Sequence, residues 1–152
     1  MVHEVVRRKS LGRCLALGVL IAGCSMQTVS VAWAADYAVI ANAGVPGTSV
    51  SKADLKAIFL GDKTTWSNGA PITVVVLEEG AAHKAFLEDV LGKTPAQFDN
   101  YWKKLVFTGK ATPPRSFADA AALASYVAKE PGAVGYIAAG TPAGSAKTLK
   151  VE

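Results

Sequence analysis

Cysteine and histidine, which serve most often as zinc ligands, are scarce in this chain. Its 152 residues include only two cysteines and two histidines. Cys14, Cys24 and His3 all lie near the amino terminus, so His83 is the only such residue in the rest of the chain. One histidine with scattered carboxylates does not form the usual zinc ligand set. We therefore predict no metal site, no cofactor and no disulfide.

Sequence motifs of common enzymes are also absent. The chain lacks a G-x-S-x-G nucleophile turn, a phosphate-binding P-loop and a G-x-G-x-x-G dinucleotide motif. Glu78 and Glu79 are a conceivable catalytic pair, but adjacent side chains on an extended segment point in opposite directions. A solvated acidic turn is the favoured interpretation, so we predict a binding protein without catalytic residues.

The amino terminus combines a basic region (Arg7–Arg13), a short apolar run (Leu15–Ala22) and an A-x-A site (Ala32–Ala34). The apolar run is too short to span a bilayer as a permanent anchor. This order is typical of a secretory signal peptide. We predict a signal peptide over residues 1–34, a single domain over residues 35–152, and a periplasmic location.

A second export signal overlaps the first. Ile21-Ala22-Gly23-Cys24 resembles a bacterial lipobox, in which Cys24 becomes the lipidated first residue. The alternative prediction is therefore a lipoprotein anchored through Cys24.

The basic character of the chain comes mainly from this amino-terminal segment. Four of the 16 Lys and Arg residues and one of the 12 acidic residues lie in residues 1–34, which leaves a net charge of +1 for the remainder. No basic stripe is visible, so we predict no nucleic-acid partner.

The most informative stretch is the predicted buried strand Ile72–Val76 together with the turn after it. The strand ends at an acidic pair and Gly80, and a helical pattern starts at once. Free amides and the positive end of a helix dipole then meet at one point, where proteins often hold anions. We expect the ligand-binding residues to be Glu79, Gly80, Ala81, Ala82 and His83.

His83 has two interpretations at this position. In the first turn of a helix it could donate a hydrogen bond to an oxyanion. Alternatively, it is a surface histidine beside Glu79 with no ligand role.

The remaining pattern alternates strands and helices. Apolar spacing and Ser/Thr caps predict helices that begin at Ser51, Gly80, Thr94 and Ser116, the first and last through S-x-x-D caps. Trp66, in the loop before the second strand, either caps a pocket or anchors that loop. Further strands are predicted at residues 37–41, 133–137 and 148–151. The fold class is α/β, with a mostly parallel sheet flanked by helices.

Two segments carry a resemblance to a known family. They are Leu55–Gly61 followed by Trp66, and Pro131–Tyr136, which reads P-G-A-V-G-Y. With the strand at Ile72–Gly80 between them, the chain resembles the periplasmic phosphate-binding proteins of ABC uptake systems, and more closely their short single-lobe relatives. The resemblance implies one lobe of a type II periplasmic-binding fold, a small anion such as phosphate as ligand, and a membrane transporter or receptor as partner.

The resemblance also shows where this chain departs from the family. Full-length members carry R-x-D-G-S-G-T, whereas Leu77, Ala81 and His83 occupy the positions of the arginine, serine and threonine. An arginine neutralises phosphate in a way that no apolar side chain can. A single lobe would also need a second copy, as in a homodimer, or another protein to enclose a ligand. The alternative function is therefore a ligand-less interaction or sensory module of the cell envelope.

Overall fold

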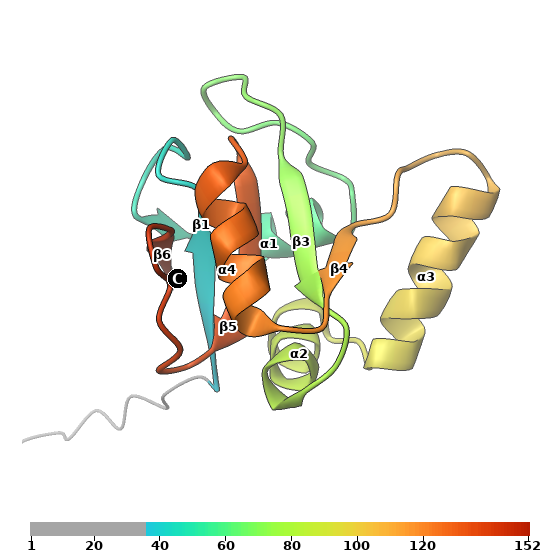
Figure 1. Ribbon diagram of the computed structural model, residues 1–152. Helices are drawn as coiled ribbons and strands as arrows, with labels where there is room; N and C mark the ends of the chain where they lie inside the picture. Colours follow the sequence, from blue (N-terminus) through green and yellow to red (C-terminus); the bar gives the residue numbers. More distant parts are fainter. Residues whose placement is uncertain (1–35) are drawn as a thin grey trace, which may run out of the picture. The chain divides into compact units, whose positions relative to one another are not determined.

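The computed structural model describes residues 36–152, which form one sheet with helices on both faces (Figure 1). The strands are β1 (Tyr37–Ala41), β2 (Ser49–Val50), β3 (Thr73–Leu77), β4 (Arg115–Phe117), β5 (Ala133–Ala138) and β6 (Lys147–Val151). The helices are α1 (Lys52–Phe59), α2 (Ala81–Phe86), its π-helical continuation η1 (Leu87–Leu91), α3 (Pro95–Phe107) and α4 (Ala120–Lys129). The predicted signal peptide and the lipobox at Cys24 lie outside the described residues.

The six strands follow the order β2-β6-β1-β5-β3-β4. β3 is parallel to β4 and β5, and β2 is parallel to β6, whereas β1 is antiparallel to both β5 and β6. The predicted α/β class is confirmed, with three of the five strand pairings parallel. β5 lies in the interior of the sheet and five of its six residues are buried, since helices cover both of its faces.

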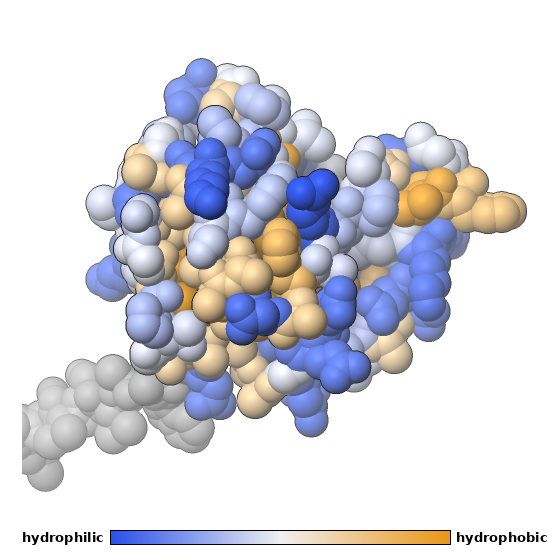
Figure 2. Space-filling view, viewed as in Figure 1, coloured by the Kyte–Doolittle hydropathy of each residue, from blue (hydrophilic) through white to orange (hydrophobic). Residues whose placement is uncertain are grey.

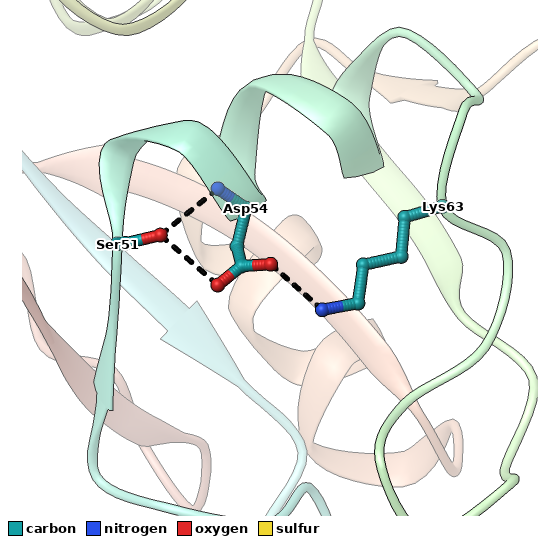
Figure 3. A network of polar contacts seen from close by, with 3 residues as sticks. All are labelled: Ser51, Asp54 and Lys63. Atoms are coloured by element: carbon teal, nitrogen blue, oxygen red, sulfur yellow. Dashed lines mark hydrogen bonds and ion pairs between the residues drawn. The ribbon is translucent and has the colours of Figure 1, made fainter.

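Helix α1 begins where its sequence predicts. The Ser51 hydroxyl accepts a hydrogen bond from the Asp54 amide at 3.0 Å, and it donates one to the Asp54 carboxylate (Figure 3). The Lys63 ammonium then pairs with the same carboxylate at 2.8 Å. These contacts satisfy an amide that the helix itself leaves without a partner. They also tie the loop after α1 back to its first turn.

At the edges of the sheet, one prediction was wrong and two short strands were not predicted. Ser116 does not cap α4, because it lies in the edge strand β4, and Asp119 accepts the capping hydrogen bond from Ala122 instead. The two-residue strand β2 was also not predicted. Both strands are too short to show an alternating pattern, so only pairing with β3 and β6 defines them.

The capping box of α3 is complete, with Thr94 and Gln97 each bonding the backbone of the other. α3 stands at the side of the sheet beyond β4, connected by loops at both ends (Figure 1). Its side chains Phe98 and Trp102 are buried, but Phe107 at its end is 93% exposed. The carboxyl-terminal end of α3 therefore projects into solvent.

An aromatic cluster forms the centre of the core. Phe86 stacks on Tyr136 with ring centroids 4.0 Å apart, and it makes edge contacts with Phe59 and Tyr37. These rings come from β1, α1, α2 and β5, so they fix α1 and α2 against the sheet. None of the helices in residues 36–152 combines the length and the hydrophobicity that spanning a bilayer requires.

Candidate functional site

The turn after β3 has the geometry that the sequence predicts. Val75, Val76 and Leu77 are buried, and the chain emerges at Glu78. Gly80 is the residue before α2 and has φ 114° and ψ 168°. Glycine adopts this conformation readily, whereas a side chain would strain it. The strand therefore passes into the helix within three exposed residues.

The amides of the turn differ in how they are used. The Glu78 amide donates to Phe117 at 2.9 Å, which extends the pairing of β3 with β4. The first intrahelical bond runs from Lys84 to the Gly80 carbonyl at 3.1 Å. The amides of Ala81, Ala82 and His83 lie before that bond, and no acceptor for them is found among residues 36–152. They are the open donors of a helix amino terminus.

The helix behind these amides is longer than α2 alone. The π-helix η1 continues α2 directly to Leu91, and Gly92, in the left-handed conformation, follows it. This arrangement places the positive end of the dipole at the turn. The carboxylates of Glu78 and Glu79 act in the opposite direction, because both are exposed beside the same amides. One of them, Glu78, accepts a hydrogen bond from the Ser116 hydroxyl at 3.1 Å.

His83 lies in the core, so its interpretation as a surface histidine was wrong. Its side chain is 5% exposed, and its Nδ1 lies 2.6 Å from the hydroxyl of Tyr136. Burial lowers the pKa of His83, although the nearby charge of Asp99 acts in the opposite direction. A neutral imidazole with one nitrogen bound to Tyr136 supplies no cation to a ligand at the turn.

Tyr136 connects this histidine to the end of β3. Burial raises the pKa of the Tyr136 hydroxyl, while a backbone hydrogen bond at Leu77 opposes that shift. Leu77 is the last residue of β3, and His83 lies in the first turn of α2. The hydroxyl therefore lies between the end of β3 and the first turn of α2, the two elements that flank the Gly80 turn.

The five predicted site residues thus divide into two groups. Glu79, Gly80 and Ala81 are exposed on the turn, whereas the side chains of Ala82 and His83 are buried. Those two residues face the turn through their amides alone. The described residues contain no group of three His, Cys, Asp or Glu side chains placed to hold a metal ion.

Trp66 anchors its loop, which was one of the two predicted roles for this residue. Its indole Nε1 donates to the Gly132 carbonyl at 2.9 Å. A Cβ at Gly132 would lie 2.1 Å from the Pro71 carbonyl oxygen. The close approach of these two loops depends on glycine, and it joins both family-like segments of the sequence.

In this domain a strand passes through a glycine turn into the amino terminus of a helix, and helices cover both faces of the mixed sheet. This is the arrangement of one lobe of a periplasmic-binding-protein fold. The family model described as the PBP superfamily domain matches residues 23–150 of the chain. The chain belongs to that family, which is a family of solute-binding proteins and not a class of enzymes.

Solved structures share this fold at low sequence identity. The chain is 23% identical, with a TM-score of 0.60, to a Clostridium perfringens protein with bound phosphate that is assigned to the substrate-binding proteins of phosphate ABC transporters. It is 21% identical, with a TM-score of 0.57, to an ABC-type phosphate transport receptor from Vibrio cholerae. It is 18% identical, with a TM-score of 0.58, to PstS from Borrelia burgdorferi.

The matches cover 76%, 76% and 77% of this chain but only 44%, 46% and 47% of those structures, in the same order. The chain therefore spans less than half the length of the solved structures that it resembles. No curated protein sequence matches it significantly.

Proposed function

We propose that this chain is an exported solute-binding domain that holds a small anion, such as phosphate, at the Gly80 turn without chemical conversion. The observation that carries the proposal is the set of open amides at Ala81, Ala82 and His83, where β3 enters a helix. The fold that presents them is shared with a protein that has bound phosphate. Export rests on the signal-peptide pattern of residues 1–34, and a membrane transporter or receptor would be the partner.

The same turn limits how tightly an anion is held. Glu78 and Glu79 repel it, His83 is neutral, and Leu77 stands where the family motif carries arginine. Backbone amides alone provide hydrogen bonds and partial charges but no counterion. We therefore expect weak binding that salt reduces further.

One substitution removes a single donor and preserves the fold. Ala81 is the first residue of α2, where proline is well tolerated and Gly80 already has an extended ψ of 168°. Ala81→Pro therefore deletes one open amide at little cost in stability. The matched control is Ala120→Pro, which makes the same change at the first residue of α4, after the extended Asp119.

Isothermal titration with inorganic phosphate tests the proposal. We expect a saturable heat signal for the natural chain and for Ala120→Pro, and a weaker affinity for Ala81→Pro. Equal affinity in both proline variants would refute the assignment of the ligand to this turn. Restoring arginine at position 77 is a poorer test, because Leu77 is only 5% exposed and a buried cation would destabilise the fold.

The alternative is a ligand-less interaction or sensory module, and one surface favours it. Val106 and Phe107 are 43% and 93% exposed at the end of α3. They border an apolar groove between α3 and β4 that Phe98 and Pro114 also line. A flat phosphate titration together with self-association that Phe107→Ser abolishes would support this alternative.

A further inference from the structure

A second cleft lies at the opposite end of β3 from the Gly80 turn. It has a volume of about 440 Å³ and lies between the loop after α1, the first residues of β3, and the loop that connects α3 to β4. In Figure 1, β3 runs from this region at the top of the view to the α2 end at the bottom. The surface is visibly hollowed between α3 and the sheet at that upper end (Figure 2). We name this hollow the basic cleft.

The charges that line the basic cleft are all of one sign. Lys63, Lys110 and Arg115 border it, and no Asp or Glu of the described residues does. Lys63 is neutralised by its ion pair with Asp54 at 2.8 Å (Figure 3). Among residues 36–152, Lys110 and Arg115 have no carboxylate within ion-pair distance. Two uncompensated cations therefore share one concave surface, which attracts an anion.

One of these cations is held in position. The Arg115 guanidinium lies 5.0 Å from the ring centroid of Tyr126, which also lines the cleft. The backbone of Arg115 pairs with Val75 in the β3–β4 ladder. The guanidinium thus projects from a strand and packs on an aromatic ring, so it loses little side-chain entropy when it binds an anion.

The walls of the basic cleft are partly apolar. Trp102 and Tyr126 contribute aromatic surface, and the half-buried Ile72 and Val74 contribute aliphatic surface. Thr64 and Thr112 add hydroxyl groups near the cations. A volume of this size lies within the range of about 300–1,000 Å³ that is usual for small-molecule sites. The combination suits a ligand with a charged end and a flat apolar body.

Trp102 provides an independent indication of a missing partner. Its side chain is 7% exposed, and its Nε1 is buried with no hydrogen-bond acceptor among the described residues. Buried donors without partners are rare and call for a specific explanation. The Cζ2 and Cη2 edge of the same indole approaches Gly61, another residue of the cleft lining. Because Trp102 lines the cleft, a ligand there is a natural source of the acceptor that this donor lacks.

We propose that the basic cleft binds a small organic anion, namely a carboxylate or a phosphate monoester that carries a flat apolar group. Arg115 and Lys110 neutralise the charge, and Trp102 and Tyr126 contact the apolar body. This site is separate from the Gly80 turn and does not depend on the function proposed there. Within residues 36–152, the cleft carries two cations without an ion-pair partner, whereas the turn carries two exposed carboxylates.

The test uses nuclear magnetic resonance of the ¹⁵N-labelled full chain at low salt. The probes are phenyl phosphate, benzoate, inorganic phosphate and the neutral benzyl alcohol. We expect phenyl phosphate or benzoate to cause saturable shifts of the Trp102 indole signal and of the amides from Lys110 to Arg115. The indole signal is assigned with Trp102→Phe. The preferred probe identifies the charged group, and the affinity should fall as salt rises.

A charge-matched pair of variants decides the role of the cations. Lys110→Gln with Arg115→Gln should weaken binding of the preferred probe at least tenfold. The control, Lys103→Gln with Lys104→Gln, removes the same charge from exposed positions of α3 outside the cleft and should leave affinity unchanged. Equal weakening in both variants would reveal only a general charge effect and would overturn the proposal.

The remaining outcomes are equally decisive. Absence of saturation for both aromatic anions, or equal binding of benzyl alcohol, overturns the proposal. Shifts confined to the amides of Ala81, Ala82 and His83 overturn it as well, while they support the function proposed for the Gly80 turn. Shifts confined to residues that line the basic cleft support the present proposal and argue against anion binding at the Gly80 turn.

Discussion

Protonation of His83 should weaken the fold, because the buried imidazole is held neutral against Tyr136. The His83 pKa is lowered in the folded state, mainly by burial, from an ordinary value of 6.5. As the pH falls through 6.5, the unfolded chain takes up a proton more readily than the folded chain does. The free energy of unfolding therefore falls as the pH decreases through 6.5, and it is nearly insensitive to this group above about pH 7.5.

The magnitude follows from the unfolded-state titration. If the folded histidine stays neutral, one proton taken up between pH 7.5 and 5.5 costs at most about 1.4 kcal/mol. Asp54 and Asp89 have lowered pKa values through their hydrogen bonds with Lys63 and Lys52, respectively. These carboxylates add stability that is lost only as the pH falls below about 4, so they do not contribute to this window.

Urea unfolding at pH 7.5, 6.5 and 5.5, followed by tryptophan fluorescence, measures the effect. His83→Gln should abolish the pH dependence, since glutamine can bond Tyr136 but does not titrate here. Tyr136→Phe is the control: it should lower stability by about 1–3 kcal/mol through the unpaired His83 nitrogen, yet retain the pH dependence. The other histidine, His3, is present in all three proteins. If His83→Gln shows the same pH dependence as the natural chain, then the buried neutral histidine is not its source.

Three further predictions concern the fold. Ser51→Ala should lower the free energy of unfolding by about 1 kcal/mol, because the first turn of α1 loses its cap, and chemical denaturation will show it. Gly132→Ala should cost more than about 2 kcal/mol, since its Cβ would lie 2.1 Å from a backbone oxygen, whereas Gly69→Ala, with a similar φ and open space, should cost only about 1 kcal/mol. Equal melting temperatures for these two glycine variants would contradict that reasoning. Phe107→Ser should change stability by less than about 0.5 kcal/mol but reduce binding of an apolar dye, because the ring is 93% exposed.

Much of the fold could be predicted because its signals are local. Ser51 and Thr94 mark the starts of α1 and α3, because each side chain accepts a hydrogen bond from a backbone amide three residues later. The glycine after Glu79 marks the strand-to-helix turn, since a positive φ is needed there. Such features depend on residues three or four apart, which makes them readable in sequence.

The candidate site was harder to predict from the same residues. His83 occupies the first turn of a helix, and nothing local distinguishes an exposed position from a buried one there. Tyr136, its partner, lies 53 residues further along the chain. The basic cleft was missed for the same reason, because the loop after α1, the loop after α3 and strand β4 bring Lys63, Lys110 and Arg115 together.

The amino-acid sequence alone determined the α/β class, the turn at Gly80 and the open amides after it, because short-range geometry and periodicity set these features. Tertiary structure alone decided that β1 runs antiparallel to its neighbours, that His83 is a neutral core residue, and that the free cations gather at the other end of β3. Strand pairing, burial and the sum of charges at a surface depend on contacts between distant segments. The local sequence pattern therefore does not predict those contacts.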